Sequence, residues 1–375
     1  MPHAARRDRL LRLIAGEEIE AVLITNPVNV TYLTGFSGDS SYLLLSGKRA
    51  ILISDGRYTV QIAEECPGLE THIRPPAQTT QEAAGGVLNR LMLASVGVES
   101  GHLTIGDLAR LSEHAAGVEF KPCADRVERL RATKDEGEIA AIRQAIHIAE
   151  KAFAMFRACL RPTDTEKELG DAIEMYVRRA GGACTAFPPI VAVGARAALP
   201  HAPLSGHRVE EAPLLLVDWG ATGELYKSDL TRVLITHNNS AIPGGSGSPA
   251  DLATIREIYD VVLRAQAAAS AKLRPGVKGG DVDAAARTLI ADAGYGDYFN
   301  HSIGHGFGLM IHEAPMMRPG SEVVLQAGMV VTIEPGIYVP GLAGIRIEDD
   351  FLITPDGHER LTHVPREFEE SIVPW

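Results

Sequence analysis

The sequence has few cysteines, and their spacing suits neither disulfide pairing nor zinc binding. Cys66, Cys123, Cys159 and Cys184 lie far apart and form no CxxC pair. A disulfide-stapled fold or a zinc knuckle would need cysteines at close, regular spacings. We therefore expect reduced thiols and a cytoplasmic protein.

An excess of positive charge and a long apolar run are also missing. The 36 Lys and Arg against 48 Asp and Glu give a formal net charge of -12, which argues against nucleic acid as the main partner. No stretch of about 18 apolar residues occurs. Acidic residues also interrupt the basic N-terminus before the apolar segment of a signal peptide could form. We therefore expect neither secretion nor membrane insertion.

The N-terminal third of the chain alternates short apolar segments with turn signals. Residues 8–15 are predicted to form an amphipathic helix, and the apolar run at 21–25 a strand. Two further apolar runs within residues 42–54 flank a turn at 46–48, a pattern typical of a β-hairpin. Such alternation predicts an α/β domain.

The pattern changes near residue 134. Apolar residues from Ile139 onwards recur every three or four positions, which predicts a long helix that ends before Pro162. A second helix is predicted over 165–180, with Thr163 and Glu166 as its capping residues.

The change of pattern predicts two domains. We place the boundary between about 125 and 135. This gives an N-terminal α/β domain of residues 1–128 and a C-terminal domain of residues 129–375. The most loop-like segment, 238–249, is expected to be a surface connection inside the second domain.

The second domain contains a similar pattern twice. Three pairs of segments match in order: "LRPTDTEKELGDAIEMYVRRAGG" from 160 with "LRPGVKGGDVDAAARTLIADAGY" from 273, "VGARAALPHAP" with "HGFGLMIHEAP", and "LLLVDWG" with "VVTIEPG". One or two such matches could arise by chance, but the preserved order favours an internal duplication. A duplication predicts a site with pseudo-twofold symmetry.

Each copy contains an apolar hairpin that carries two acids. In the first copy we assume a turn centred on Gly223 and Glu224, and in the second a loop centred on Gly341. Residues opposite each other on one face of a hairpin lie close together. The predicted opposing pairs are Asp218 with Asp229 and Glu334 with Glu348.

Acids within apolar strands indicate a cation site. Burying a carboxylate is unfavourable unless its charge is compensated, and a second carboxylate on the same face increases the cost. Four carboxylates and one imidazole can hold two divalent cations, with carboxylates bridging them. The imidazole candidate is His305, which lies between the two hairpins in the sequence.

Taken singly, each of these residues has a simpler explanation. Asp218 could begin a turn, Glu334 could end a strand, and a lone histidine is more often packed or exposed than a ligand. Two of the acids could form ordinary surface ion pairs, namely Asp229 with Arg232 and Glu348 with Arg346. The joint pattern of four acids at matching places favours the metal site.

Several motifs in this order resemble one known family. They are "ALPH", "VDWGA", "YKSDLTR", "GHGFGLMIHE", "IEPGIY" and "RIEDD", preceded by "NVTYLTGFSG", "SDGRY" and "LRATKDEGEIAAIRQA". Over nearly its full length the chain resembles the pita-bread metallopeptidases that cleave Xaa-Pro bonds, the Xaa-Pro aminopeptidases and prolidases. The resemblance implies an α/β (α+β) protein with a creatinase-type N-terminal domain and a pita-bread catalytic domain.

The resemblance also implies a role for each site residue. The five metal ligands fall on Asp218, Asp229, His305, Glu334 and Glu348. By this resemblance Asp229 and Glu348 bridge both ions, Asp218 holds one, and His305 with Glu334 holds the other. Two divalent ions are implied, with manganese as the expected metal and zinc, cobalt or iron as alternatives, because an oxygen-rich site with one imidazole suits several metals.

Four further residues match positions near the reaction in this family. His201 and His312 match the catalytic histidines beside the metals, and His301 and Arg346 match residues near the substrate. Trp219 stands where phenylalanine is usual, a conservative difference. A homodimer and proline-containing peptide substrates are also family expectations.

The implied reaction is hydrolysis of the bond before proline by hydroxide formed between the two ions. Glu334 could carry the proton to the leaving nitrogen, while His312 and His201 donate hydrogen bonds to the developing oxyanion and the substrate. No protein nucleophile is required.

Several rival functions share these motifs or this fold. We favour an Xaa-Pro aminopeptidase over an Xaa-Pro dipeptidase, because the compact N-terminal domain resembles that of short bacterial aminopeptidases. A metal-free creatinase-like hydrolase and a non-catalytic pita-bread interaction protein are less compatible with four opposed carboxylates. A methionine aminopeptidase fits poorly with the long N-terminal domain and "ALPH".

Overall fold

The computed structural model describes residues 2–47, 49–236 and 249–374. It divides the chain into two compact units, Met1–Arg131 and Ala132–Trp375. Within the described ranges, no helix combines the length and apolar character needed to cross a membrane. The expected surface connection at 238–249 lies outside the described residues, apart from Pro249, at which a helix begins.

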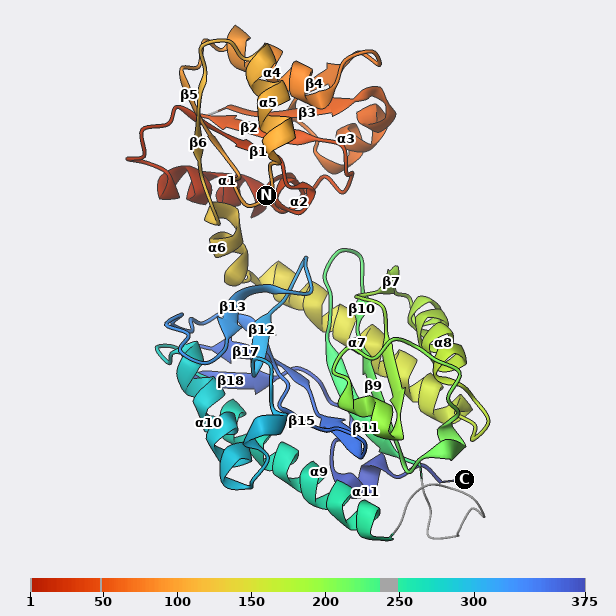
Figure 1. Ribbon diagram of the computed structural model, residues 1–375. Helices are drawn as coiled ribbons and strands as arrows, with labels where there is room; N and C mark the ends of the chain where they lie inside the picture. The colour runs from red at the N-terminus through yellow and green to blue at the C-terminus, as the bar shows by residue number, and fades with distance from the viewer. Residues whose placement is uncertain (1, 48, 237–248, 375) are drawn as a thin grey trace. The chain divides into compact units, whose positions relative to one another are not determined.

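The first unit is built on one six-stranded sheet (Figure 1). The strand order is β4-β3-β2-β1-β5-β6, antiparallel within β1-β2-β3 and parallel elsewhere. The strands are β1 Ala21–Ile24, β2 Tyr42–Ser46, β3 Arg49–Asp55, β4 Glu70–Arg74, β5 Ser95–Val98 and β6 Glu119–Pro122. The predicted α/β alternation, the strand at 21–25 and the hairpin are confirmed, although Lys48 of the predicted turn lies outside the described residues.

Helices cover this sheet and complete its core. They are α1 Pro2–Leu13, α2 Pro27–Thr34, α3 Thr59–Glu65, α4 Thr80–Arg90 and α5 Ile105–His114, followed by α6 Arg126–Ala132. Val87 and Leu88 of α4 and Leu111 of α5 pack in one cluster with strand residues such as Leu23 and Leu44. Burial of these side chains is the main source of this unit's stability.

The first helix begins earlier than predicted. Arg6, which an apolar pattern ignores, is buried because its guanidinium donates to Tyr32 O at 3.1 Å and lies 4.3 Å from the Tyr32 ring centroid. His3 Nδ1 also lies 3.1 Å from Tyr32 O. These polar contacts extend α1 towards residue 2.

The second unit repeats one order of elements. A long helix, a shorter helix and a set of strands come first as α7 Glu136–Cys159, α8 Glu166–Arg179, β7 Cys184–Thr185, β8 Ile190–Val193, β9 Leu214–Trp219, β10 Ala221–Thr222 and β11 Leu230–Ile235. The second set is α9 Pro249–Ser270, α10 Gly279–Asp292, β12 Gly304–Gly306, β13 Glu313–Met317, β14 Val330–Ile333, β15 Gly336–Val339, β16 Ala343–Arg346 and β17 Asp349–Thr354. The chain ends with β18 Gly357–Arg360 and α11 Phe368–Ser371. The predicted internal duplication is confirmed in this order of helices and strands.

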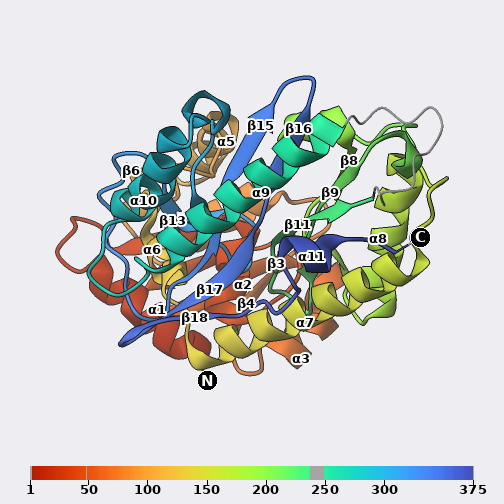
Figure 2. The same ribbon diagram turned by 90° about the horizontal axis from the view of Figure 1, so that it is seen from below.

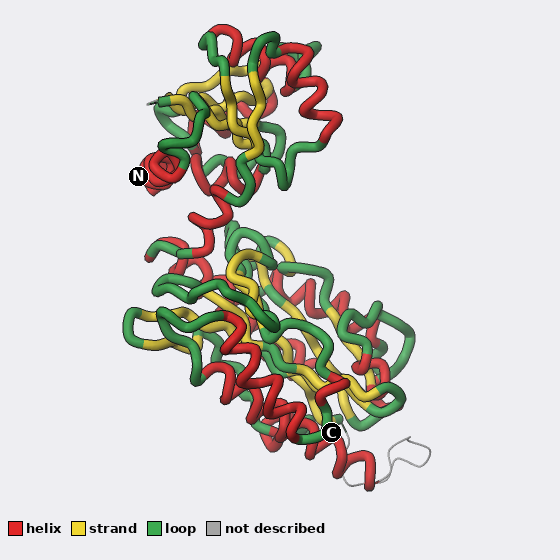
Figure 3. Tube along the Cα trace, turned by 60° about the vertical axis from the view of Figure 1, so that its left-hand side comes forward, coloured by secondary structure: helices red, strands yellow, loops and turns green. Residues whose placement is uncertain are grey.

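The helices of this unit pack along the strands (Figures 2 and 3). The helix pair α7 and α8 shares one apolar cluster with β8, β9 and β11, whereas α9 and α10 share another with β14 to β17. The sheets have the orders β11-β9-β8 and β13-β12-β14-β17-β18. A bridge between Thr231 and Glu348 joins the two halves.

The long helix is confirmed, but the predicted cap of the next helix is wrong. Thr165, and not Thr163, is the N-cap of α8, because its hydroxyl accepts from Glu168 N and the Glu168 carboxylate accepts from Thr165 N. Glu166 is instead fully buried and accepts hydrogen bonds from Val193 N and Arg196 Nε. The local sequence offers two overlapping capping boxes, and these tertiary contacts of Glu166 select the second.

The two acidic hairpins differ in how well their register was predicted. In the second hairpin, Ile333 pairs with Asp349 and Gly336 with Arg346, so Glu334 faces Glu348 as predicted from a loop centred on Gly341.

In the first hairpin the predicted register is wrong by two residues. Asp218 pairs with Thr231 instead of Asp229, because Gly223 N donates to Tyr226 O and the turn is centred one residue later. Since side chains alternate with a period of two, this shift keeps Asp218 and Asp229 on the same face.

Candidate metal centre

One cavity of about 600 Å³ in the second unit collects all nine predicted site residues. They are His201, Asp218, Asp229, His301, His305, His312, Glu334, Arg346 and Glu348. Asp218 lies on β9 and His305 on β12. The other three acids lie at strand ends, where Asp229 precedes β11, Glu334 follows β14 and Glu348 precedes β17. Strand ends from both halves therefore position the predicted ligands.

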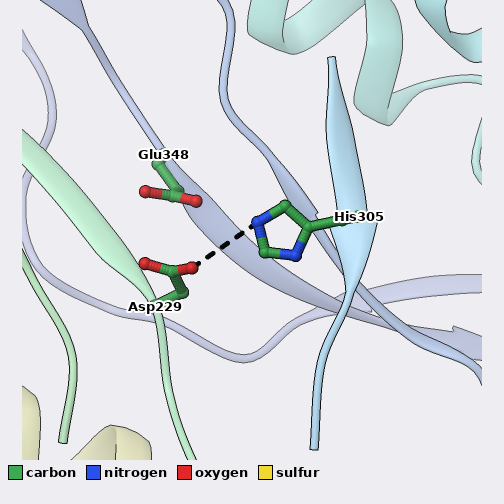
Figure 4. A group of neighbouring side chains, drawn as sticks. All are labelled: Asp229, His305 and Glu348. Carbon is green, nitrogen blue, oxygen red and sulfur yellow. Dashed lines mark ion pairs between the residues drawn. The ribbon is translucent and has the colours of Figure 1, made fainter. Parts of the chain in front are cut away.

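Asp229, His305 and Glu348 form a compact group of possible metal ligands in this cavity. One ligand atom from each lies within 4.8 Å of the others. His305 Nε2 lies 3.6 Å from Asp229 Oδ2 and 3.5 Å from Glu334 Oε1. Figure 4 shows the Asp229 and Glu348 carboxylates, from separate strands, facing the imidazole nitrogen. Oxygen and imidazole donors in this arrangement suit a divalent transition metal.

The carboxyl groups of this cluster resist ionisation in the absence of a cation. Burial, followed by the charge of Glu348, raises the pKa of Asp229 well above its usual value. Burial and then Glu334 raise the pKa of Glu348 in the same way. Burial raises the pKa of Glu334 to about 8. Bound cations would reverse these shifts, because an opposite charge favours the carboxylate form.

Asp218 offers a free ligand atom to the same cluster. Its Oδ2 accepts from Arg346 at 2.5 Å, but its buried Oδ1 has no hydrogen-bond partner in the described part of the chain. A buried polar atom without a partner is unfavourable unless a ligand supplies the contact. Both the donor set and this unpaired oxygen therefore fit bound metal.

His305 is held as a neutral imidazole with one nitrogen free for metal. Burial, with a smaller effect from His312, lowers the pKa of His305 to about 4. Its Nδ1 lies 3.1 Å from Gly306 O. A carbonyl oxygen only accepts, so Nδ1 carries the proton and the lone pair of Nε2 points to the acids.

The two surface ion pairs considered as simpler explanations are wrong. Arg232 pairs with Asp349 at 2.7 Å and not with Asp229. Arg346 pairs with Asp218 and not with Glu348. Asp229 and Glu348 therefore keep their carboxylates directed at the cavity.

Two further residues hold the site together and were not singled out from the sequence. The Tyr338 hydroxyl lies 2.9 Å from His301 Nε2 and 2.8 Å from an Arg346 nitrogen. Thr231 donates to Glu348 Oε2 at 2.7 Å and accepts from Arg346 Nε at 3.0 Å. Both residues stand inside the quoted motifs "IEPGIY" and "YKSDLTR", which were the available signal.

The metal-free protein should show the cost of burying Glu334. The wild-type protein should lose stability relative to Glu334→Gln as the pH rises from about 4.5 to about 8. The folded-state pKa of Glu334 is raised to about 8, so over this range the carboxyl group ionises in the unfolded chain before it does in the folded one. The upper bound is about 5 kcal/mol at 1.36 kcal/mol per pKa unit. Denaturant unfolding of both metal-free proteins at pH 5 and pH 8 measures this difference. An equal pH dependence of the two proteins would contradict the assignment.

The chain matches known proteins over nearly its whole length. Residues 140–355 match the family model of metallopeptidase family M24, and residues 6–133 match that of the creatinase/prolidase N-terminal domain. A Pyrococcus horikoshii protein named Xaa-Pro dipeptidase is 36% identical over 360 residues, which cover 96% of this chain and 97% of that protein.

Solved structures are also similar to this chain over nearly its whole length. The Xaa-Pro dipeptidase from Bacillus anthracis has a TM-score of 0.90 and 35% identity, covering 98% of this chain and 99% of that one. The X-Pro aminopeptidase from Thermotoga maritima MSB8 has a TM-score of 0.85 and 36% identity, covering 96% and 99%. The chain therefore belongs to metallopeptidase family M24, with a creatinase/prolidase N-terminal domain before its pita-bread peptidase domain.

Proposed function

We propose that this peptidase hydrolyses the bond between an N-terminal residue and a following proline, with Xaa-Pro dipeptides as its main substrates. One observation carries the proposal. Four carboxylates and the neutral imidazole of His305 meet at one cavity, where burial raises the pKa of every acid. Without cations such a cluster would be unfavourable, and with two cations it is compensated.

Five residues would hold two divalent ions. They are Asp218, Asp229, His305, Glu334 and Glu348, which all line the same cavity. When bound, the ions would acidify a water molecule and polarise the scissile carbonyl. The preference for manganese and the homodimer stay predictions.

The protein's own groups would then handle the proton and orient the peptide. Glu334, which lines the cavity, would accept the proton released during attack and pass it to the leaving proline nitrogen. His312 and His201, which line the same cavity, would donate hydrogen bonds to the developing oxyanion and the substrate. His301, which is held by its contact with the Tyr338 hydroxyl, would contact the substrate.

The cavity wall suits a proline ring. Its apolar lining includes Phe187, Pro188, Pro189, Ile190 and Ile311. Apolar side chains around a few convergent polar groups are the usual composition of a small-molecule site. Burial of the pyrrolidine against this wall would place the preceding carbonyl near the acids.

An Xaa-Pro aminopeptidase acting on longer peptides is the second candidate. The argument for it from the compact N-terminal domain loses force, because the relative named Xaa-Pro dipeptidase matches over 97% of its length and so includes that domain. The candidate is supported by the full-length similarity to the Thermotoga maritima X-Pro aminopeptidase.

A direct comparison of two peptides tests the proposal. The metal-loaded enzyme should hydrolyse Ala-Pro with a kcat/KM at least about tenfold above that for Ala-Pro-Ala, a difference of about 1.4 kcal/mol. The reverse order would favour the aminopeptidase. Failure to cleave either peptide, in a protein that also binds no added divalent metal, would favour the creatinase-like or non-catalytic alternatives.

A further inference from the structure

A buried ion pair lies against the loop that carries His312. Residues 307–312 connect β12 to β13, and Glu313 is the first residue of β13. Glu313 Oε2 lies 3.3 Å from Lys134 Nζ, and the two side chains are only 5% and 1% exposed. Lys134 precedes α7, so the pair joins segments far apart in the sequence.

The Glu313 carboxylate also holds the backbone of this loop. Its Oε1 accepts from Met310 N at 2.8 Å. Gly308 N donates to Met310 O, and Lys227 N donates to Gly308 O, both at 2.9 Å. The loop is therefore tied through one carboxylate to Lys134 and through its backbone to the segment before β11.

Lys134 is itself fixed in place. Its backbone N–H donates to Gly328 O at 2.8 Å, and the preceding Thr133 forms an antiparallel bridge with Met329. The following Asp135 is the N-cap of α7. A lysine held on both sides by regular structure can act as a rigid anchor for the loop.

Glycine at position 308 allows the close packing at this ion pair. A Cβ there would lie 3.1 Å from Lys134 Cε and 3.2 Å from Glu313 Oε2. These distances are shorter than ordinary van der Waals contacts between such atoms. The loop backbone therefore lies directly against the ion pair, where a larger side chain at position 308 would displace Lys134 or Glu313.

Stability alone is a poor reason for such a pair. Two buried charges lose their hydration, and apolar residues of similar size often stabilise a protein at least as well. Resting on the proposed function, we propose that Lys134 and Glu313 are positioning residues that hold His312 beside the metal ligand His305. The two imidazole rings lie 4.5 Å apart in an edge-to-face arrangement, and the ion pair fixes the loop that sets this distance.

The test compares Lys134→Met, Glu313→Gln and the double variant with the exposed pair Lys278 and Glu322. The double variant has no charge at either position of this pair, and the side-chain oxygen of the glutamine at position 313 can still accept from Met310 N. It should regain most of the melting temperature lost by Lys134→Met. Lys278→Met and Glu322→Gln are matched controls, because their side chains are 49% and 78% exposed.

Hydrogen exchange separates positioning from simple stabilisation. In the metal-free double variant, amides of residues 307–313 should exchange at least about tenfold faster than in the wild type. Metal content should be unchanged, whereas kcat for Ala-Pro should fall at least about tenfold with KM within about threefold. If the double variant recovers the wild-type exchange rate and kcat together with the melting temperature, the proposal is overturned. If the wild type does not cleave Ala-Pro, the proposed function fails, and exchange in the metal-free protein still decides the role of the ion pair.

Discussion

Replacing Asp229 by asparagine should abolish Xaa-Pro hydrolysis and leave the fold intact. The expected loss in kcat/KM is at least about 1,000-fold, or about 4 kcal/mol of transition-state stabilisation. Asp229 Oδ2 lies 3.6 Å from His305 Nε2, and Asp229, His305 and Glu348 form one compact group of possible ligands. An amide lacks the negative charge that would compensate bound cations, so the ions would be held poorly. Glu348→Gln should behave alike.

The same substitution should not lower the melting temperature of the metal-free protein. Burial and Glu348 raise the pKa of Asp229 well above its usual value, so an uncharged side chain removes an unfavourable charge. The readouts are kcat/KM, bound metal and the melting temperature without metal. Asp356→Asn, at an exposed position beside β18, is the matched control. Full activity of Asp229→Asn with normal metal content would contradict the proposed role of Asp229 as a metal ligand.

Replacing His312 by alanine should separate catalysis from metal binding. The ring lines the cavity at 4.5 Å from the His305 ring, and we propose that it donates a hydrogen bond to the substrate. Loss of one such donor or proton-transfer group lowers kcat by about 100-fold or more. Because the five ligands remain, the variant should keep the same number of bound ions as the wild type.

The control for this variant is His363→Ala, which removes an imidazole that is 73% exposed. It should change neither kcat nor metal content. Steady-state kinetics and elemental analysis of both variants make the comparison. Loss of metal from His312→Ala would make His312 a ligand, and unchanged kinetics would show that it has no role in turnover.

Local patterns predicted the elements of the site better than its details. Glu334 and Glu348 face each other as predicted, because the loop around Gly341 sets the register of a regular hairpin. The predicted pairing of Asp218 was wrong by two residues. The turn forms between Gly223 and Tyr226, and β10, which follows β9, pairs with β7. A register shift of two residues keeps each side chain on the same face of the hairpin, so both acids still line one cavity, as predicted.

Contacts between distant segments account for what the sequence did not predict. The partner of Arg232 is Asp349 and the partner of Lys134 is Glu313, and in each case more than a hundred residues separate the two. Neither pairing follows from periodicity or local charge, because both depend on how the duplicated halves pack. Glu166 shows the same effect, since a tertiary contact removes it from the cap that local sequence predicts.

A metal titration of the chelated protein tests the central claim most directly. Metal-free protein should be inactive towards Ala-Pro, bind two divalent ions per chain, and regain activity as they bind. Asp229→Asn should fail to bind two ions in the same titration. Undiminished hydrolysis of Ala-Pro by wild-type protein with no divalent metal bound would contradict the account.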